Sequence, residues 1–132
     1  MPSPSLYILL CSQERDKLQM GSMLASVAAV SERPVHVFVS MGAIKAFDKS
    51  VEGVARYTEG SFSAELTDKN APDPVELFGQ GKMLGDMTMH ACSMVLDVLG
   101  WEEDQLTEDL FDGQMGLTKF LSDAEEGQLI TL

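Results

Sequence analysis

The sequence is poor in cysteine, histidine and basic residues. It contains two cysteines, two histidines and nine Lys or Arg residues against 21 Asp or Glu residues, for a net charge of −12. Two cysteines do not form a disulfide framework, and a reducing compartment keeps both as free thiols. The deficit of positive charge argues against long-range attraction to nucleic acid or to anionic lipid. We therefore expect neither nucleic acid nor a membrane as a partner.

Long apolar runs and several functional motifs are also missing. No stretch reaches the length needed to cross a bilayer, and the segment MPSPSLYILLC lacks the features of a signal peptide. The chain has no phosphate-binding G-x-x-x-x-G-K-[ST] loop, no dinucleotide-binding G-x-G-x-x-G turn and no nucleophile elbow around a serine. These absences predict a cytoplasmic protein without a nucleotide cofactor or serine hydrolase chemistry. We expect no cofactor of any kind.

The composition is that of a folded globular protein. Apolar residues make up 45% of the 132 residues and charged residues 23%. A chain of this length buries enough surface for a core without metal or disulfide support. We predict a single domain over residues 1–132. The acidic residues are densest in the last third of the chain, where a solvated face is the simplest interpretation.

Apolar runs and helical periodicities alternate along the chain. Expected strands cover residues 5–11, 35–40, 86–91 and 128–132, and expected helices cover 13–31, 41–49, 74–84, 93–99, 106–112 and part of 114–126. The segment 51–73 is predicted to be mostly loop. Alternation of this kind predicts an α/β fold, a three-layer α/β/α sandwich with a mostly parallel sheet of four or five strands.

The two cysteines close two of the expected strands. Cys11 ends the first strand and Cys92 follows the third. In the common strand order 2-1-3-4 these strands are neighbours, and the ligand crevice of such sheets lies at their carboxyl ends. We therefore expect both thiols in one crevice, with their Cα atoms within or just beyond the limit of about 7 Å for a disulfide.

Cys92 has the better position for chemistry. It precedes the expected helix 93–99, whose N-terminus favours an anion and so favours the thiolate. His90 is two residues earlier on the strand and faces the same side, and Ser93 begins the helix. These residues and Cys11 are the candidate supporting groups around Cys92. The alternative is that both cysteines are core packing residues and that His90 is an ordinary half-buried histidine.

A metal site is a weaker interpretation of the same segment. Met87, Met89, His90 and Cys92 are ligand types that suit a soft metal ion. Strand alternation sends the two methionine side chains away from His90 and Cys92. We expect no metal at this position.

Four segments together resemble the DsrE/DsrF-like family of small sulfur-metabolism proteins. They are YILLCSQERDKLQMGSMLASVAAV, VHVFVSMGAIKAF, GDMTMHACSMVLDVLGW and MGLTKFLSDAEEGQLITL. The most specific piece is the A-C-S-M-x-x-D-x-x-G pattern at 91–100. One branch of the family has F-F-T-F-W-G after the second strand, where this chain has FVSMG at 38–42.

This resemblance implies a function for Cys92. In the family, the cysteine at this position accepts a sulfane sulfur as a persulfide and passes it to a partner thiol. The implied partners are sulfur donor and acceptor proteins or small sulfane sulfur compounds, and Cys11 would shield or resolve the persulfide. Family members form homo-oligomers, trimers or hexamers, with the cysteine near a subunit boundary.

Two other functions remain open at this stage. The same fold serves noncatalytic oligomeric proteins that bind a ligand or organise an assembly. A peroxide-reducing thiol protein is the third possibility, although the sequence lacks the proline- and threonine-rich surroundings of a peroxidatic cysteine. The sulfur carrier or sulfurtransferase is the leading hypothesis.

Overall fold

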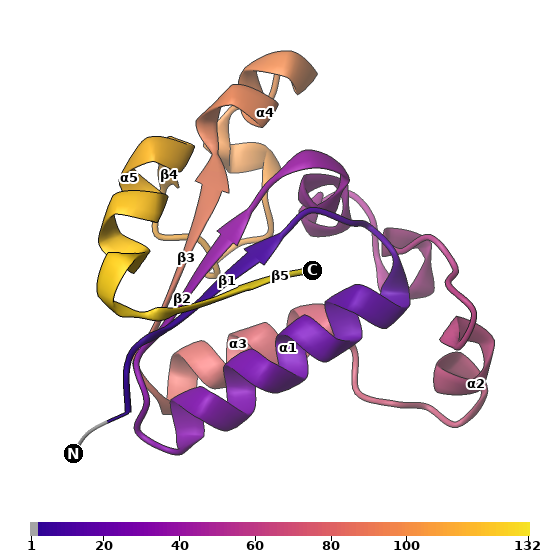
Figure 1. Ribbon diagram of the computed structural model, residues 1–132. Coiled ribbons are helices and arrows are strands. Elements are labelled where there is room, and N and C mark those ends of the chain that lie inside the picture. The colour runs from indigo at the N-terminus through magenta and orange to yellow at the C-terminus, as the bar shows by residue number, and fades with distance from the viewer. Residues whose placement is uncertain (1–2) are drawn as a thin grey trace.

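Three buried apolar strands form the centre of a five-stranded parallel sheet. The computed structural model describes residues 3–132, and the strand order is β4-β3-β2-β1-β5. The strands are β1 (Leu6–Leu10), β2 (Val35–Val39), β3 (Met87–Cys92), β4 (Gln114–Met115) and β5 (Gln128–Thr131). All neighbouring pairs run parallel. Helices flank both faces of the sheet, so the predicted three-layer α/β/α fold is confirmed (Figure 1).

The two longest helices lie side by side on one face of the sheet. They are α1 (Arg15–Val30) and α3 (Pro74–Leu84), while α5 (Leu117–Asp123) lies on the other face (Figure 1). The remaining helical segments are η1 (Met41–Phe47), η2 (Gly53–Arg56), α2 (Ser63–Asp68), α4 (Ser93–Leu99), η3 (Glu103–Gln105) and η4 (Ala124–Glu126). Figure 1 shows α4 beyond the carboxyl end of β3.

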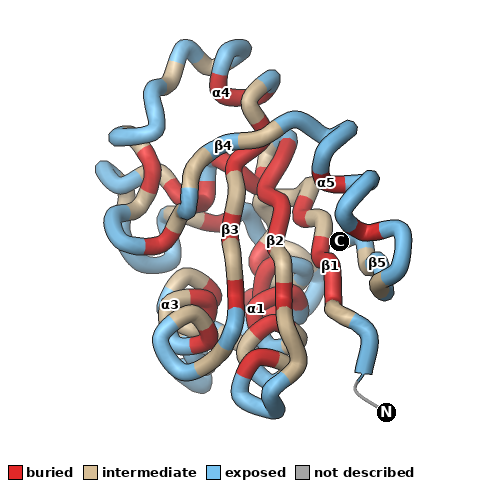
Figure 2. The backbone as a smooth tube through the Cα atoms, turned by 90° about the vertical axis from the view of Figure 1, so that its left-hand side faces the viewer, coloured by how far each residue is buried: buried red, intermediate tan, exposed pale blue. Residues whose placement is uncertain are grey.

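Strand alternation divides the core into two layers. Ile8, Val37 and Met89 are fully buried on the side of α1 and α3. On the opposite face, Phe120 of α5 stacks on Phe38, with ring centroids 4.9 Å apart. Figure 2 shows that buried residues follow the strands and the inward faces of the helices. The sheet therefore has a thick apolar layer on one side and a thinner aromatic layer on the other.

The predicted helix 74–84 is confirmed, and its ends have clear causes. The Asp73 side chain accepts hydrogen bonds from the backbone N–H groups of Val75 and Glu76, and Pro74 occupies the first turn. Gly85 ends the helix. A Cβ atom there would lie 2.3 Å from the backbone oxygen of Ala29, so glycine permits the close approach of α3 to the end of α1.

The expected strand order 2-1-3-4 is wrong. Strand β2 lies between β1 and β3, and the reversal point is between β1 and β5. The reason is that α1 and α3 cover the same face, so successive right-handed crossovers add β2 and then β3 in one direction. The chain returns to the other side of β1 only through α5, on the opposite face.

The expected helix 106–112 is also wrong. Leu106 and Leu110 are buried at a helical spacing, but tertiary hydrogen bonds replace helical ones. The backbone N–H of Thr107 donates to Phe47 O, and that of Asp112 donates to Met89 O. The segment expected to be mostly loop, 51–73, contains the short helical segments η2 and α2. Among residues 3–132, no helix has both the length and the apolar character required to span a bilayer.

Candidate functional site

Three small side chains lie at the carboxyl ends of the three central strands. Leu10 of β1 pairs with Val39 of β2, and Val39 pairs with Ala91 of β3. The next residues are therefore Cys11, Ser40 and Cys92, which continue the same row at the carboxyl edge of the sheet. By alternation, this row faces the side of the sheet on which α5 lies. We call Cys11, Ser40 and Cys92 the thiol row.

The two thiols are not on neighbouring strands. Ser40 and strand β2 separate them, and two strand spacings amount to about 9.6 Å. That exceeds the limit of about 7 Å between the Cα atoms of a disulfide. The expectation that the cysteines end adjacent strands is therefore wrong, although both lie at the same edge and on the same face. Both cysteines are free thiols.

Cys92 is buried in the isolated chain. It is the last residue of β3 and the N-cap residue of α4, which confirms its predicted place at the strand-to-helix junction. Only 5% of its surface is exposed. Its partner in the register is Met115 of β4, and the Ser93 hydroxyl donates to Met115 O at 3.4 Å. Ser93 therefore connects the start of α4 to β4, directly beside Cys92.

Cys11 is half-buried and so is the more accessible thiol of the pair. Its backbone N–H donates to Leu132 O at 2.7 Å, which fixes the loop after β1 against the end of β5. Burial raises the pKa of the Cys11 thiol, the charge of a Cys92 thiolate raises it further, and Lys17 partly opposes both effects. Cys11 is thus held in its neutral form at neutral pH and can donate a weak S–H hydrogen bond.

His90 lies in a cleft between the sheet and α5, and it faces the same side as Cys92. The cleft has a volume of about 390 Å³ and is lined by Tyr7, His36, Val37, Thr88, His90, Met115, Lys119, Phe120 and Asp123. Met115 belongs both to this lining and to the pair with Cys92. The cleft therefore extends along β3 toward the thiol row. We call it the histidine cleft.

The sequence did not predict the other polar residues of this region. His36 is fixed by a hydrogen bond of 2.8 Å between its Nδ1 and Thr88 Oγ1, and its ring stacks on Tyr7 with centroids 4.7 Å apart. Ser40 could have been found from the run VHVFVS, because it ends its strand as Cys11 ends the first one. His36 required knowledge that β2 and β3 are neighbours.

The described part of the chain has no cluster of candidate metal ligands. Residues 3–132 contain no group of three or more His, Cys, Asp or Glu side chains arranged to hold a metal ion. Met87 and Met89 are buried on the opposite face of β3 from His90, as alternation predicted.

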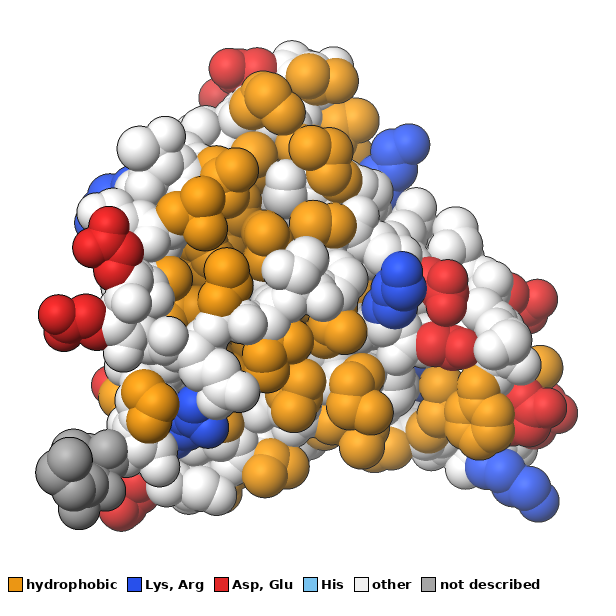
Figure 3. All heavy atoms as spheres, in the orientation of Figure 1, with side chains coloured by type: hydrophobic (Ala, Val, Ile, Leu, Met, Phe, Trp, Pro, Cys, Tyr) orange, Lys and Arg blue, Asp and Glu red, His pale blue; other side chains and the backbone are white. Residues whose placement is uncertain are grey.

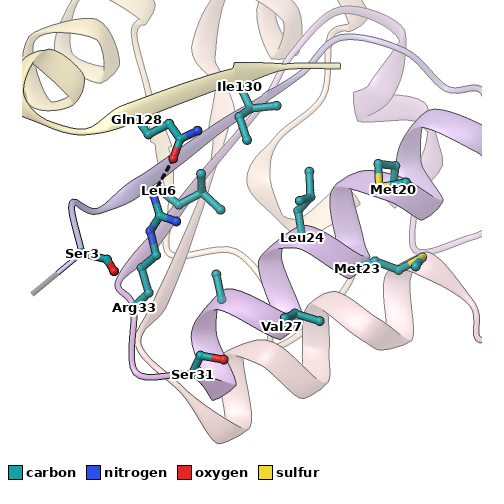
Figure 4. A pocket seen from close by; sticks show the side chains of 11 residues that line it. Ser3, Leu6, Met20, Met23, Leu24, Val27, Ser31, Arg33, Gln128 and Ile130 are labelled. Atoms are coloured by element: carbon teal, nitrogen blue, oxygen red, sulfur yellow. Dashed lines mark hydrogen bonds between the residues drawn. The ribbon is translucent and has the colours of Figure 1, made fainter.

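A second cavity is remote from the thiols. It is an apolar groove of about 570 Å³ between α1 and the strands β1 and β5. Met20, Met23, Leu24 and Val27 line it from α1, and Leu6 and Ile130 line it from the strands (Figure 4). The Arg33 guanidinium donates to Gln128 Oε1 at one end. Its volume exceeds that of the histidine cleft, but it lacks nucleophiles and converging polar groups, so we assign chemistry to the cleft and not to the groove.

This groove belongs to a wider apolar face. In Figure 3 hydrophobic side chains form a band that extends upward from the region of α1, with acidic side chains toward its margins. Val27 is 66% exposed, and Met20, Met23, Val30 and Leu129 are also exposed. We call the exposed side chains of α1 and β5 the α1–β5 face.

Comparison with known proteins supports the fold and leaves the function open. Neither the protein-family models nor the curated proteins gave a match to this sequence. Among solved structures, a protein of unknown function from Methanobacterium thermoautotrophicum has a similar fold, with a TM-score of 0.64 and 13% sequence identity. The match covers 98% of this chain and all of the other. At this level of identity the likeness concerns the fold alone.

Proposed function

We propose that the protein is a sulfur carrier that holds a sulfane sulfur as a persulfide on Cys92, as its resemblance to the DsrE/DsrF-like family implies. The observation that supports this proposal is the thiol row. Cys11, Ser40 and Cys92 come together at the carboxyl edge of a parallel sheet, which is where ligands of such folds bind.

The transfer needs no external oxidant or reductant. The Cys92 thiolate attacks the outer sulfur of a donor RS–S⁻, a new S–S bond forms, and the donor S–S bond breaks as RS⁻ leaves with the electron pair. An acceptor thiolate then attacks the terminal sulfur of the Cys92 persulfide and releases the Cys92 thiolate. The rates depend on thiolate fraction, leaving-group pKa and access.

Cys11 and Ser40 have supporting roles in this proposal. The raised pKa of Cys11 makes it a poor competitor for the sulfur and keeps its S–H available as a donor toward a persulfide anion. Resolution of the persulfide by Cys11 as a Cys11–Cys92 disulfide does not fit, because β2 separates their strands. Cys11 therefore shields the persulfide.

We also propose that the chain forms a homo-oligomer through the α1–β5 face. Gln128 N–H donates to Ser5 O, and Leu132 N–H donates to Leu9 O. Because alternate residues of a strand direct their peptide groups to opposite edges, those of Leu129 and Thr131 face the outer edge of β5. Within residues 3–132, β5 pairs only with β1. A second copy of β5 matches this edge.

The distribution of charge supports a second copy of this chain as the occupant. The chain has 21 acidic and nine basic residues, yet the stretches 18–31 and 127–132 contain none of either. Depletion of charge is typical of the core of a protein interface. It also removes the repulsion that two copies of a −12 chain would otherwise meet at their contact. Covering each half-exposed apolar side chain contributes on the order of 1 kcal/mol.

A noncatalytic assembly protein is the second candidate function. The observation that favours it is the contrast between a thiol that is 5% exposed and an extensive apolar surface. In that case Cys92 is a core residue and the α1–β5 face is the functional surface.

The two candidates differ in the mass of the protein after exposure to polysulfide under anaerobic conditions. A carrier gains sulfur on Cys92, retains most of this gain in Cys11→Ser and loses it in Cys92→Ser. An assembly protein gains no sulfur while folded, and its Cys92→Ser variant keeps the same oligomeric state. Oxygen additions to Cys92 with peroxide, without sulfur additions, would indicate peroxide chemistry instead.

A further inference from the structure

The histidine cleft brings together both histidines of the protein. Lys119 and Asp123 of α5 line it as well, so it holds one permanent positive charge beside one negative charge. His36 and His90 are on neighbouring strands and face the same side, since His36 pairs with Thr88 and His90 is two residues further along β3. Nothing in the proposed persulfide chemistry requires two histidines here.

The cleft presents hydrogen-bond donors rather than a set of metal ligands. Thr88 Oγ1 and His36 Nδ1 are 2.8 Å apart, so a hydroxyl that donates to Nδ1 leaves Nε2–H of His36 as a donor. Stacking on Tyr7 holds the ring in place. As noted above, residues 3–132 contain no cluster suited to a metal ion. A ligand rich in hydrogen-bond acceptors fits these donors better than a cation does.

Lys119 is available to such a ligand. Its ammonium group donates to Asp123 at 2.9 and 3.2 Å, but this i, i+4 pair is exposed on α5. Exposed pairs of this kind contribute little to stability. An anion in the cleft can therefore draw Lys119 away from Asp123 at little cost.

The cleft adjoins the thiol row along one strand. Thr88, His90 and Cys92 occupy alternate positions on the same face of β3, and two residues of a parallel strand span about 6.6 Å. Met115 lines the cleft and pairs with Cys92, so it marks the end of the cleft nearest the sulfur. A group held by His90 therefore lies two residues along β3 from the nucleophile Cys92.

We infer that the histidine cleft binds the oxyanion end of a sulfane sulfur donor of the thiosulfate class, with His36, His90 and Lys119 as its ligands. This inference rests on the proposed function and deepens it by naming the donor class. The Cys92 thiolate attacks the sulfane sulfur, the S–S bond of thiosulfate breaks, and sulfite leaves with the electron pair. The same three groups that bind the donor stabilise the departing sulfite.

Protonation of the histidines couples to this binding. Burial lowers the pKa of His36, opposed by Asp86 and Asp123 and aided by His90. Burial also lowers the pKa of His90; Asp112 and Asp123 oppose this, while Lys82 and Lys119 add to it. Both imidazoles are therefore largely neutral at pH 7. A bound anion raises both pKa values, so its affinity increases as the pH falls toward the lowered pKa values of the two histidines.

The test separates binding from transfer by using Cys92→Ser, which cannot accept sulfur. Thiosulfate or sulfate is added at constant ionic strength, and the Hε1 NMR signals of the two histidines are followed. We expect saturable shifts of both signals with both anions, tighter binding at pH 5.5 than at 7.5, and no saturation with chloride. Non-saturating shifts, or equal affinity at the two pH values, would overturn the inference.

Variants in the same background identify the ligands. Replacing His90 with Gln removes a charge-assisted hydrogen bond and should weaken thiosulfate binding about tenfold. Lys119→Gln, a surface change that leaves the fold intact, should weaken it about threefold. Lys69→Gln, on an exposed lysine outside the cleft, is the matched control. Equal effects of the two lysine variants would show that only general charge attraction is at work.

Failure of this inference is distinguishable from failure of the proposed function. Polysulfide carries sulfane sulfur without sulfonate oxygens, so it loads Cys92 of the otherwise unchanged protein whether or not the cleft binds oxyanions. If polysulfide loads Cys92 but no anion binds saturably, the carrier function is supported and oxyanion binding by the cleft is rejected. Anion binding without sulfur gain from either donor supports the cleft and rejects the carrier function.

Discussion

Cys11 and Cys92 face the same side of the sheet at the same edge, but strand β2 lies between the strands that they end. The charge of a Cys92 thiolate raises the pKa of Cys11, yet their Cα atoms are about two strand spacings apart. The pair is therefore coupled electrostatically and cannot be joined by a disulfide without moving the sheet. In the proposed function, Cys11 can therefore shield a persulfide on Cys92 but cannot resolve it as a disulfide.

A first prediction concerns oxidation of the native protein. We expect a mild oxidant to leave Cys11 and Cys92 unlinked in the folded monomer, because a disulfide would require displacement of β2. The same treatment in urea should give the intramolecular disulfide. Mass spectrometry after alkylation measures the outcome. Rapid formation of the bond under native conditions would mean that the edge of the sheet opens easily.

A second prediction concerns access to Cys92. In a Cys11→Ser background, Met115→Ala should increase the rate at which an alkylating reagent modifies Cys92 by several-fold, because Met115 is the residue of the cleft that pairs with it. Leu129→Ala, an exposed change on β5, is the control. If the two variants react at the same rate, Cys92 becomes accessible through another opening.

A third prediction concerns association. Val27→Glu places a charge in the middle of the α1–β5 face and should dissociate the oligomer. Analytical ultracentrifugation at micromolar concentration should then give a lower molar mass than for the unchanged protein. Val54→Glu is a matched control, since Val54 is 60% exposed on η2, away from this face. A monomeric starting protein, or equal dissociation by both variants, would reject this face as the interface.

A fourth prediction concerns pH and stability. The folded pKa of His36 lies below the ordinary value of 6.5, so the unfolded state binds more protons below that pH. Stability from this group is fully present above about pH 6.5 and is lost as the pH falls through the folded pKa. His36→Gln should therefore lose less thermal stability than the unchanged protein between pH 7.5 and 5.5. Identical pH profiles would contradict this account.

A fifth prediction tests the packing of α1 against α3. Gly85→Ala should lower the free energy of unfolding by about 1–3 kcal/mol, because its Cβ would lie 2.3 Å from Ala29 O and backbone must move. Gly79→Ala is the matched change within α3 itself. No atom lies within 4 Å of its Cβ position, so a gain of up to about 1 kcal/mol is expected from helix propensity. Chemical denaturation measures both.

Local patterns were sufficient for most of the secondary structure. The apolar runs at 5–11 and 35–40 match β1 and β2, and helices 74–84 and 93–99 match α3 and α4 in full. These elements depend on periodicity, capping and glycine or proline placement, all of which are local in sequence. The prediction of a helix over 106–112 was wrong because backbone N–H groups of this segment donate to Phe47 and Met89, which are distant in sequence.

The sequence by itself determined the fold class, the strand-to-helix junction at Cys92 and the shared face of His90 and Cys92, because each follows from residue order along one element. Only the tertiary structure decided that β2 lies between the two thiols, that Cys92 is buried and that His36 joins His90 in one cleft. Strand order is set by the face on which each crossover helix packs, and burial is set by segments distant in sequence. Neither quantity is encoded in the spacing of neighbouring residues.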